Sequence, residues 1–251
     1  MKLLPRGTRA VNGDPLYAVC DRMSRQTLVI GDVHGCAHEL EDLLDLCAYA
    51  SGDDVVLVGD VVAKGPKSRE ALALMRQVGA RSVRGNHDHA VLRWRPALEA
   101  GTAAPEGGPQ HLRLARTLSA EDWAVLDAMT LWLTLPEHDG VIVVHAGLVP
   151  GVPLAEQEPD MLMNVRTIRA DGRGSRRADD GALWGELYRG PELVLFGHNA
   201  MRGLQRHDHA IGLDTGCVYG GRLTAYVLSA DRFVSVPARE NGRLLPEIAP
   251  E

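Results

Sequence analysis

The chain has 251 residues, of which 45% are hydrophobic, and a formal net charge of −6. This length and apolar content suit one large globular domain or two small ones, and they argue against intrinsic disorder. The acidic balance argues against sequence-independent binding to a long nucleic acid, because such binding depends on basic side chains that displace counterions.

Cysteine spacing and hydropathy bear on the compartment of the protein. The four cysteines (Cys20, Cys36, Cys47 and Cys217) form no C-x-x-C pair, so we expect neither a zinc ribbon nor a disulfide framework. Prolines and glycines interrupt the first 24 residues, where a secretory leader needs an apolar run, and no run of about 18 apolar residues occurs anywhere. We therefore expect a soluble, cytoplasmic protein without a membrane partner.

The first part of the chain alternates strand-like and helix-like segments. Apolar runs at 27–30, 55–58 and 80–83 are typical of buried strands, and apolar residues recur at helical spacing over 37–50 and 68–78. This order predicts a parallel sheet whose strands all end at the same edge.

The later segments change character. Residues 90–135 predict a helical cap inserted into the sheet domain, with a connection rich in Gly, Pro and Ala at 101–109. The segment 151–190 carries several arginines but too many Gly and Asp residues for one long helix. Strands are expected to resume at 141–145, 193–196, 210–213, 223–228 and 233–236.

Polar side chains directly follow the first three predicted strands. The motifs are Gly-Asp-Val-His-Gly (31–35), Gly-Asp (59–60) and Arg-Gly-Asn-His-Asp (84–88), which contain Asp32, His34, Asp60, Asn86 and His87. Ligands bind at the carboxyl edge of the strands in open α/β sheets, so we expect these side chains to converge. Carboxylate and imidazole groups of this kind are the ligands of a two-metal hydrolytic centre.

Two more histidines, His145 and His198, also end apolar runs. A single histidine or Gly-Asp turn is usually only structural, but the joint, ordered occurrence of these residues at strand ends favours metal binding. We expect two divalent ions, with manganese as the first choice and iron, zinc or cobalt as alternatives. Asp60 is the expected bridge, with Asp32 and His34 on one ion and Asn86, His145 and His198 on the other.

The ordered motifs resemble those of the calcineurin-like metallophosphoesterases, in the branch that holds the phosphoprotein phosphatases and the symmetrical diadenosine tetraphosphatases. They are Gly-Asp-Val-His-Gly, Gly-Asp-x-Val, Arg-Gly-Asn-His-Asp, His-Ala-Gly and Gly-His, and they cover positions 27 to about 228. The resemblance implies an α/β fold of four layers, with two mixed β-sheets flanked by helices. We expect it to form a single domain over 1–251, with the helical cap at 90–135.

Departures from the family patterns refine this placement. Gly-His-Asn-Ala (197–200) lacks the second histidine of the Gly-His-x-His motif found in many nucleases, whereas Lys-Gly-Pro (64–66) and the segment 213–221 resemble the ApaH-like phosphatase subgroup. Ala63 stands where phosphoprotein phosphatases have the carboxylate that pairs with the catalytic histidine. Asp88 or Asp214 is the expected substitute.

Five residues are expected to act on the substrate. His87, next to Asn86, is the candidate general acid for the leaving oxygen, and Arg84 is the first choice for a phosphate clamp. Lys64 supplies a second positive charge. Arg166 could bind distant phosphates, and an ordinary solvated surface arginine is an equally good interpretation of it. Tyr219 could stack on a nucleobase, or it could be an ordinary turn tyrosine.

The leading functional hypothesis is hydrolysis of the phosphoanhydride bonds of dinucleoside polyphosphates, with diadenosine tetraphosphate split into two ADP. The alternatives are a phosphoprotein phosphatase for Ser, Thr or Tyr, and an inorganic polyphosphatase that uses the arginines of 166–177 as a basic track. A binding module without catalysis is disfavoured, because such a protein is expected to lack one or more ligands, and all six are present.

Overall fold

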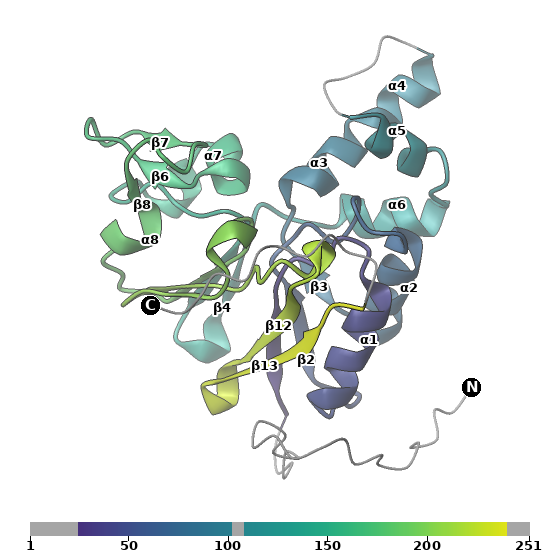
Figure 1. The fold of residues 1–251 in the computed structure, drawn as a ribbon, viewed down its shortest axis with the longest axis horizontal. Helices are drawn as coiled ribbons and strands as arrows, with labels where there is room; N and C mark the ends of the chain where they lie inside the picture. The colour runs from purple at the N-terminus through teal and green to yellow at the C-terminus, as the bar shows by residue number, and fades with distance from the viewer. Residues whose placement is uncertain (1–24, 102–107, 240–251) are drawn as a thin grey trace.

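A computed structural model describes residues 25–101 and 108–239 of the chain. The first 24 residues, Cys20 and most of the expected connection at 101–109 therefore lie outside the described residues. Two five-stranded mixed sheets form the centre of the molecule (Figure 1).

The first sheet has the strand order β13-β12-β1-β2-β3. Its parallel strands are connected by two helices, in the predicted order β1 (Thr27–Ile30), α1 (Ala37–Leu46), β2 (Asp54–Leu57), α2 (Ser68–Val78) and β3 (Arg81–Ser82). The hairpin of β12 (Arg222–Val227) and β13 (Arg232–Pro237) completes it in antiparallel pairing. α1 ends four residues before the predicted boundary, since Ala48 takes a left-handed backbone conformation (φ 53°) that turns the chain.

The second sheet has the order β10-β11-β9-β5-β4. Its parallel centre is formed by β5 (Val141–Val144), β9 (Val194–Phe196) and β11 (Ala210–Gly212), and its antiparallel edges by β4 (Trp132–Leu135) and β10 (Gln205–Arg206). The last four residues of the expected helical cap thus belong to a strand, because they pair along β5 from Val144 to Val141.

Alternating side chains explain why the layers stack. On β1, Leu28 and Ile30 pack in the core shared with α1 and α2, whereas Val29 packs in the core between the sheets. A strand covered on both faces reads as a continuous apolar run. On the outer face of the second sheet, Leu162 of α7 (Pro159–Asn164) and Trp184 of α8 (Trp184–Leu187) share a third core. The predicted four-layer α/β sandwich is confirmed.

Two segments extend beyond the sandwich (Figure 1). The helical segment comprises α3 (Asn86–Leu92), α4 (Trp94–Ala100), α5 (Pro109–Ala115) and α6 (Ala120–Asp127), and its core is continuous with that of α1 and α2. The small-sheet segment comprises α7, β6 (Thr167–Ile168), β7 (Gly174–Ser175), β8 (Ala182–Leu183) and α8. Sequence periodicity could not predict these three strands, because two residues are too few to show an alternation.

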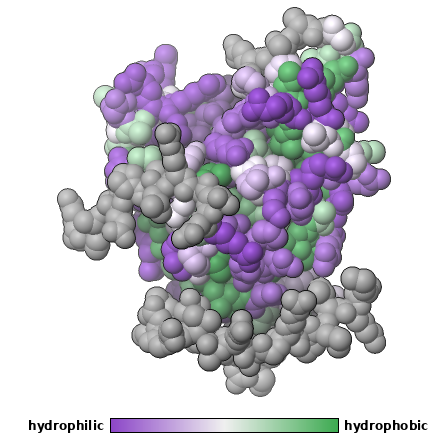
Figure 2. All heavy atoms as spheres, turned by 45° about the vertical axis from the view of Figure 1, so that its right-hand side comes forward, coloured by the Kyte–Doolittle hydropathy of each residue, from purple (hydrophilic) through white to green (hydrophobic). Residues whose placement is uncertain are grey.

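The described surface offers no membrane-spanning helix. Hydrophilic residues predominate on the face drawn in Figure 2, where apolar residues form small separate groups. No helix within the described ranges is long and apolar enough to cross a bilayer. The large apolar side chains are instead concentrated in the three buried cores.

Leu195 tests the core between the two sheets. It is 0% exposed, so Leu195→Ala should lower the free energy of unfolding by about 2–5 kcal/mol in urea denaturation, because it leaves a cavity. Leu204, which is 41% exposed, is the matched control. Leu204→Ala should change the free energy of unfolding by less than about 0.5 kcal/mol. Equal losses in the two variants would contradict this packing.

Candidate metal centre and substrate pocket

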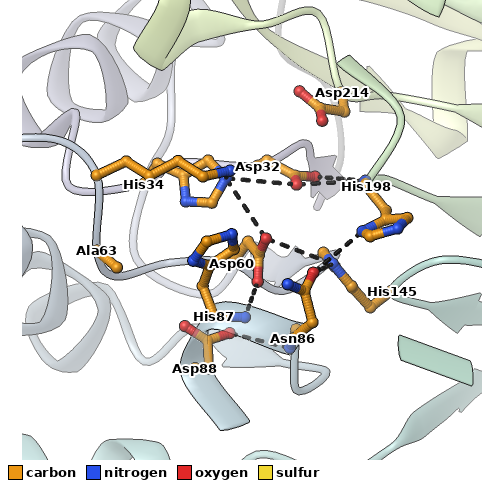
Figure 3. A network of polar contacts seen from close by, with 12 residues as sticks. Asp32, His34, Asp60, Ala63, Asn86, His87, Asp88, His145, His198 and Asp214 are labelled. Atoms are coloured by element: carbon orange, nitrogen blue, oxygen red, sulfur yellow. Dashed lines mark hydrogen bonds and ion pairs between the residues drawn. The ribbon is translucent and has the colours of Figure 1, made fainter. Parts of the chain in front are cut away.

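The strand ends of both sheets meet at one site (Figure 3). Three of the expected ligands follow β1 and β2, two follow β5 and β9, and one begins α3 just after β3. In chain order they are Asp32, His34, Asp60, Asn86, His145 and His198. Carboxyl ends of parallel strands from two facing sheets therefore bring together residues as far apart as 166 positions in the sequence.

The backbone at this site is tightly constrained. His34, Asp60 and His198 all have positive φ (47°, 50° and 69°), a conformation that costs energy for residues other than glycine and that clusters at functional sites. A Cβ atom at Gly85 would overlap the Asp60 carboxylate, and one at Gly197 would overlap that of Asp32. The glycines of the motifs thus allow the chain to approach the two carboxylates closely.

Asp60 lies at the middle of the cluster. Its Oδ1 accepts a hydrogen bond from the His87 backbone N–H at 2.8 Å, and its Oδ2 lies 3.4 Å from His34 Nε2 and 3.5 Å from His145 Nε2. Both oxygens of Asp32 lie 3.2 Å from the backbone N–H of His198. Asp60 is therefore the carboxylate that faces both groups of expected ligands.

Two imidazoles are held with a ring nitrogen directed at Asp60. His145 Nδ1 lies 2.9 Å from the Val58 carbonyl, and His34 Nδ1 lies 3.3 Å from that of Val62. Burial lowers the pKa of His145 to about 4 and that of His34 well below its usual value, so both rings are neutral at pH 7. The Nδ1 proton is donated to the carbonyl in each case, which leaves the Nε2 lone pair facing the carboxylate.

Electron-pair donors crowd together here in a way that fits divalent cations. Asn86 Oδ1 lies 3.1 Å from His145 Nε2 and 3.0 Å from His198 Nδ1, and the buried Nε2 of His198 has no hydrogen-bond partner among the described residues. At the other expected metal position, that of Asp32 and His34, the Lys64 ammonium lies 2.9 Å from His34 Nε2. A positive charge therefore lies next to the nitrogen that is expected to bind the metal. Carboxylate, amide and imidazole donors suit manganese, iron, cobalt or zinc.

Three carboxyl groups, those of Asp32, Asp60 and Asp214, are buried in this cluster, which makes their joint ionisation unfavourable. Burial raises the pKa of Asp60 to about 7, and burial together with the carboxylates of Asp214 and Asp60 raises that of Asp32 well above its usual value. The pKa of Asp214 is also raised, mainly by burial. Lys64 opposes all three shifts through its positive charge. Full ionisation of the cluster therefore requires additional positive charge.

A pocket of about 660 Å³ opens from this cluster. Asp60, Asn86 and His87 line it on the sandwich side, together with three of the expected substrate residues, Lys64, Arg166 and Tyr219. The wall also includes Arg176, Arg177 and Arg202. The structure thus joins the candidate metal centre to a group of basic side chains in one cavity.

Two of the expected catalytic side chains, those of Arg84 and Asp88, have other contacts in the structure. Arg84 does not line the pocket; its guanidinium turns toward the connection between α6 and β4, where Nη2 donates to the Met129 carbonyl at 2.9 Å. The Asp88 carboxylate accepts hydrogen bonds from the backbone N–H groups of Val61, Val62 and Gly85 at 3.0–3.2 Å. Asp88 therefore braces the loops that carry Asp60 and Asn86, rather than orienting His87.

The partner of His87 is a residue that the sequence did not single out. His87 Nδ1 lies 2.9 Å from Nε2 of His111, a buried residue of α5. Asp214, the other expected substitute, instead accepts from the Gly216 backbone N–H at 3.1 Å, and its negative charge acts on Asp32, whose pKa it raises. Burial and the charge of Lys64 lower the pKa of His87 to about 3. The one signal for His111 in the sequence was its place within the expected helical cap at 90–135, and no motif marks it there.

Comparisons with known proteins agree with this geometry. A family profile described as calcineurin-like phosphoesterase matches residues 26–234, which include every expected ligand. The chain belongs to this family. Its fold and its cluster of carboxylates and imidazoles imply divalent metal ions at this site.

Similar proteins carry related names. The chain is 30% identical to a symmetrical bis(5'-nucleosyl)-tetraphosphatase of Aromatoleum aromaticum, over 83% of this chain and 96% of the relative. It is 28% identical to an asymmetrical bis(5'-nucleosyl)-tetraphosphatase of Oceanobacillus iheyensis, over 84% and 92%. A crystal structure of a protein provisionally named a diadenosine tetraphosphatase superposes with a TM-score of 0.78 at 36% identity, over 87% of this chain and 96% of that one.

The raised pKa of Asp60 predicts pH-dependent stabilisation by metal. Its folded-state pKa of about 7 lies above the unfolded value of about 3.9, so the stability that it contributes is full below about pH 4 and is lost as the pH rises through 7. A divalent cation such as manganese would bind the deprotonated form and should restore that stability. In thermal melts, the increase in Tm on adding manganese should therefore be larger at pH 8 than at pH 6.

The neutral imidazoles sharpen this test. Because the pKa of His145 is about 4, histidine protonation does not compete with the metal at pH 6, and the pH dependence reports the carboxylates. Asp60→Asn should remove most of the metal effect at both pH values. A manganese effect of equal size at pH 6 and pH 8 in the wild type would contradict the raised pKa.

Proposed function

We propose that the protein is a divalent-metal-dependent phosphohydrolase that cleaves the phosphoanhydride bonds of dinucleoside polyphosphates, splitting diadenosine tetraphosphate into two ADP. The observation that carries this proposal is the single pocket that joins the candidate metal centre to Lys64, Arg166 and Arg202. A substrate with four consecutive phosphates needs positive charge beyond the reaction centre. We place the activity in the cytoplasm, on the cysteine pattern and the nucleotide substrate.

The proposed metal ligands are the six residues at the strand ends, with manganese as the proposed metal. Asp60 would be shared, Asp32 and His34 would serve one ion, and Asn86, His145 and His198 the other. When bound, such a pair of ions polarises a phosphoryl group and lowers the pKa of a water. Asp88 supports this arrangement from outside, since it fixes the backbone just after Asp60 and just before Asn86.

The chain's own cations provide the proposed phosphate site. Arg176 is paired with Asp160 and Arg177 with Asp179, so part of their charge is already neutralised. The Arg202 side chain has no hydrogen bond or ion pair within the described part of the chain, and Arg166 uses Nη1 on the Arg176 carbonyl. Arg202 and the remaining donors of Arg166 are therefore proposed to bind the phosphates farther from the metal centre.

His87 and Tyr219 complete the proposed site. With Nδ1 engaged by His111, the Nε2 of His87 is the ring nitrogen left to protonate the leaving oxygen, and the negative charge of a bound phosphate would raise the low pKa of His87 and favour the protonated ring that this role needs. The Tyr219 ring lies 5.2 Å from the Lys64 ammonium and lines the pocket, where it could stack on a nucleobase. We propose one domain over 1–251, in which the helical segment caps the side of the pocket next to His87.

A substrate panel tests the proposed reaction. Wild-type protein with manganese should release two ADP from diadenosine tetraphosphate faster than it releases phosphate from a phosphoserine peptide or from inorganic polyphosphate, as measured by chromatography of the products. Relatives include both symmetrical and asymmetrical tetraphosphatases, so the product pair is part of the test. ATP with AMP as the main products would overturn the symmetrical cleavage.

A matched pair of variants ties this activity to the metal centre. Asp60→Asn should abolish turnover and weaken metal binding, because it removes the shared carboxylate. Asp208→Asn, on an exposed residue that does not line the pocket, should retain wild-type turnover. In the substrate panel, faster phosphate release from the phosphoserine peptide would instead favour a phosphoprotein phosphatase, and faster release from polyphosphate would favour an inorganic polyphosphatase.

Arg202→Ala tests the distal phosphate site. Loss of one exposed charged contact, worth about 1 kcal/mol, should raise the KM for diadenosine tetraphosphate about fivefold, with kcat nearly unchanged. The KM for 4-nitrophenyl phosphate, which has one phosphate, should stay within about twofold. Arg173→Ala is the control, because Arg173 is exposed and outside the pocket. Equal KM changes for the two substrates would refute the role of Arg202.

A further inference from the structure

His111 is the one side chain from α5 that reaches the candidate reaction centre. It is 6% exposed, and its Nε2 lies 2.9 Å from His87 Nδ1, with the two ring centroids 5.1 Å apart. Polar atoms in such a place are normally satisfied by water or by the carboxylates nearby. Here a histidine from a separate helix satisfies the second nitrogen of the residue that faces the substrate.

The neighbourhood of His87 leaves no other ring partner among the described residues. The carboxylate of Asp88, the next residue, accepts hydrogen bonds from three backbone N–H groups, and Asp214 faces Asp32. Ala63 has no polar side chain. The imidazole of His34 meets His87 edge-on at 5.0 Å between centroids, with Nδ1 on a carbonyl and Nε2 at Asp60.

We propose that His111 is the positioning residue for His87: its hydrogen bond fixes the ring so that Nε2 of His87 faces the pocket. Imidazole can donate or accept at this contact, so it holds the ring whether or not Nδ1 of His87 carries a proton. It also adds no negative charge to a wall that must receive an anionic substrate. This inference rests on the role of His87 proposed above, and it makes α5 part of the reaction site.

Packing explains how α5 can hold the ring in place. Ala115, one turn along α5 from His111, is buried in the same core as Val91 of α3 and Leu126 of α6. The two histidines are thus carried by helices that share a core, so their separation is set by packing rather than by a loose loop. Figure 1 shows α5 next to α3 at the top of the molecule.

The test compares two phosphomonoesters that differ in the basicity of the leaving group. Phenyl phosphate has a basic leaving oxygen that needs an acid, whereas 4-nitrophenyl phosphate does not. His111→Leu should lower kcat for phenyl phosphate about 10- to 100-fold, but that for 4-nitrophenyl phosphate by less than about threefold, with KM little changed. His111→Gln, which keeps a polar group near the position of Nε2, should recover the phenyl phosphate rate to within about threefold of wild type.

A double-variant cycle separates positioning from a structural effect. If His111 acts through His87, then His87→Asn with His111→Leu should be no slower on phenyl phosphate than His87→Asn alone. His89→Leu, which changes a half-buried histidine on α3 outside the pocket, is the control and should resemble wild type on both esters. Melting temperature and bound manganese are measured for every variant.

The outcomes are distinct from those of the substrate panel. The positioning role would be overturned if the double variant lost kcat by the product of the two single-variant losses. It would also be overturned if His111→Leu lowered kcat equally for both esters while its metal content stayed normal. A His87→Asn variant with wild-type rates on phenyl phosphate would overturn it as well, because no acid would then need orienting. Failure to cleave diadenosine tetraphosphate, with the ester results as expected, would overturn the proposed substrate and leave this inference intact.

Discussion

The cost of burying three carboxylates beside neutral imidazoles governs the centre of this molecule. Asp32, Asp60 and Asp214 lie together in the interior, and their pKa values are raised because few positive charges compensate them. Lys64 opposes these shifts from the pocket side. Such a cluster is stable only if the surrounding fold holds it together, and it becomes favourable once divalent cations bind.

The fold supplies that support through backbone groups rather than through opposite charges. The backbone N–H of His87 binds the Asp60 carboxylate within the edge of the first sheet, and that of His198 binds the Asp32 carboxylate across the two sheets. Left-handed conformations at His34, Asp60 and His198 bring the backbone into these positions. The local strain is tolerable because each of these residues lies within four positions of the end of a strand packed on both faces.

The sequence predicted this part of the structure well, because short motifs at strand ends need little three-dimensional information. Parallel strands share an edge, so Asp32, Asp60 and Asn86 could be placed together without coordinates. The direction of a side chain beyond a strand end is not encoded in such a pattern. Arg84 was expected at the phosphates because its planar guanidinium can bind two oxygens at once, yet it turns to the Met129 carbonyl.

Contacts between distant helices were beyond sequence reasoning for a related reason. His111 belongs to a short helix whose position depends on how α5 packs on α3, and nothing in its neighbouring residues marks it as functional. Asp88 was misassigned because adjacency to His87 in sequence does not place two side chains together on a helix. Periodicity likewise could not show the small sheet, which positions Arg166 in the pocket wall.

In the proposed function, the two segments outside the sandwich would contact different parts of the substrate. The helical segment provides Asn86, His87 and His111 near the reaction centre, whereas the small-sheet segment provides Arg166, Arg176 and Arg177 farther along the pocket. Neither changes the strand ends that hold the carboxylates. A metal centre of this type acts on the phosphoryl group, so selectivity for what carries that group must come from these segments. The choice between a nucleotide and a phosphopeptide therefore depends on side chains that lie outside the family motifs.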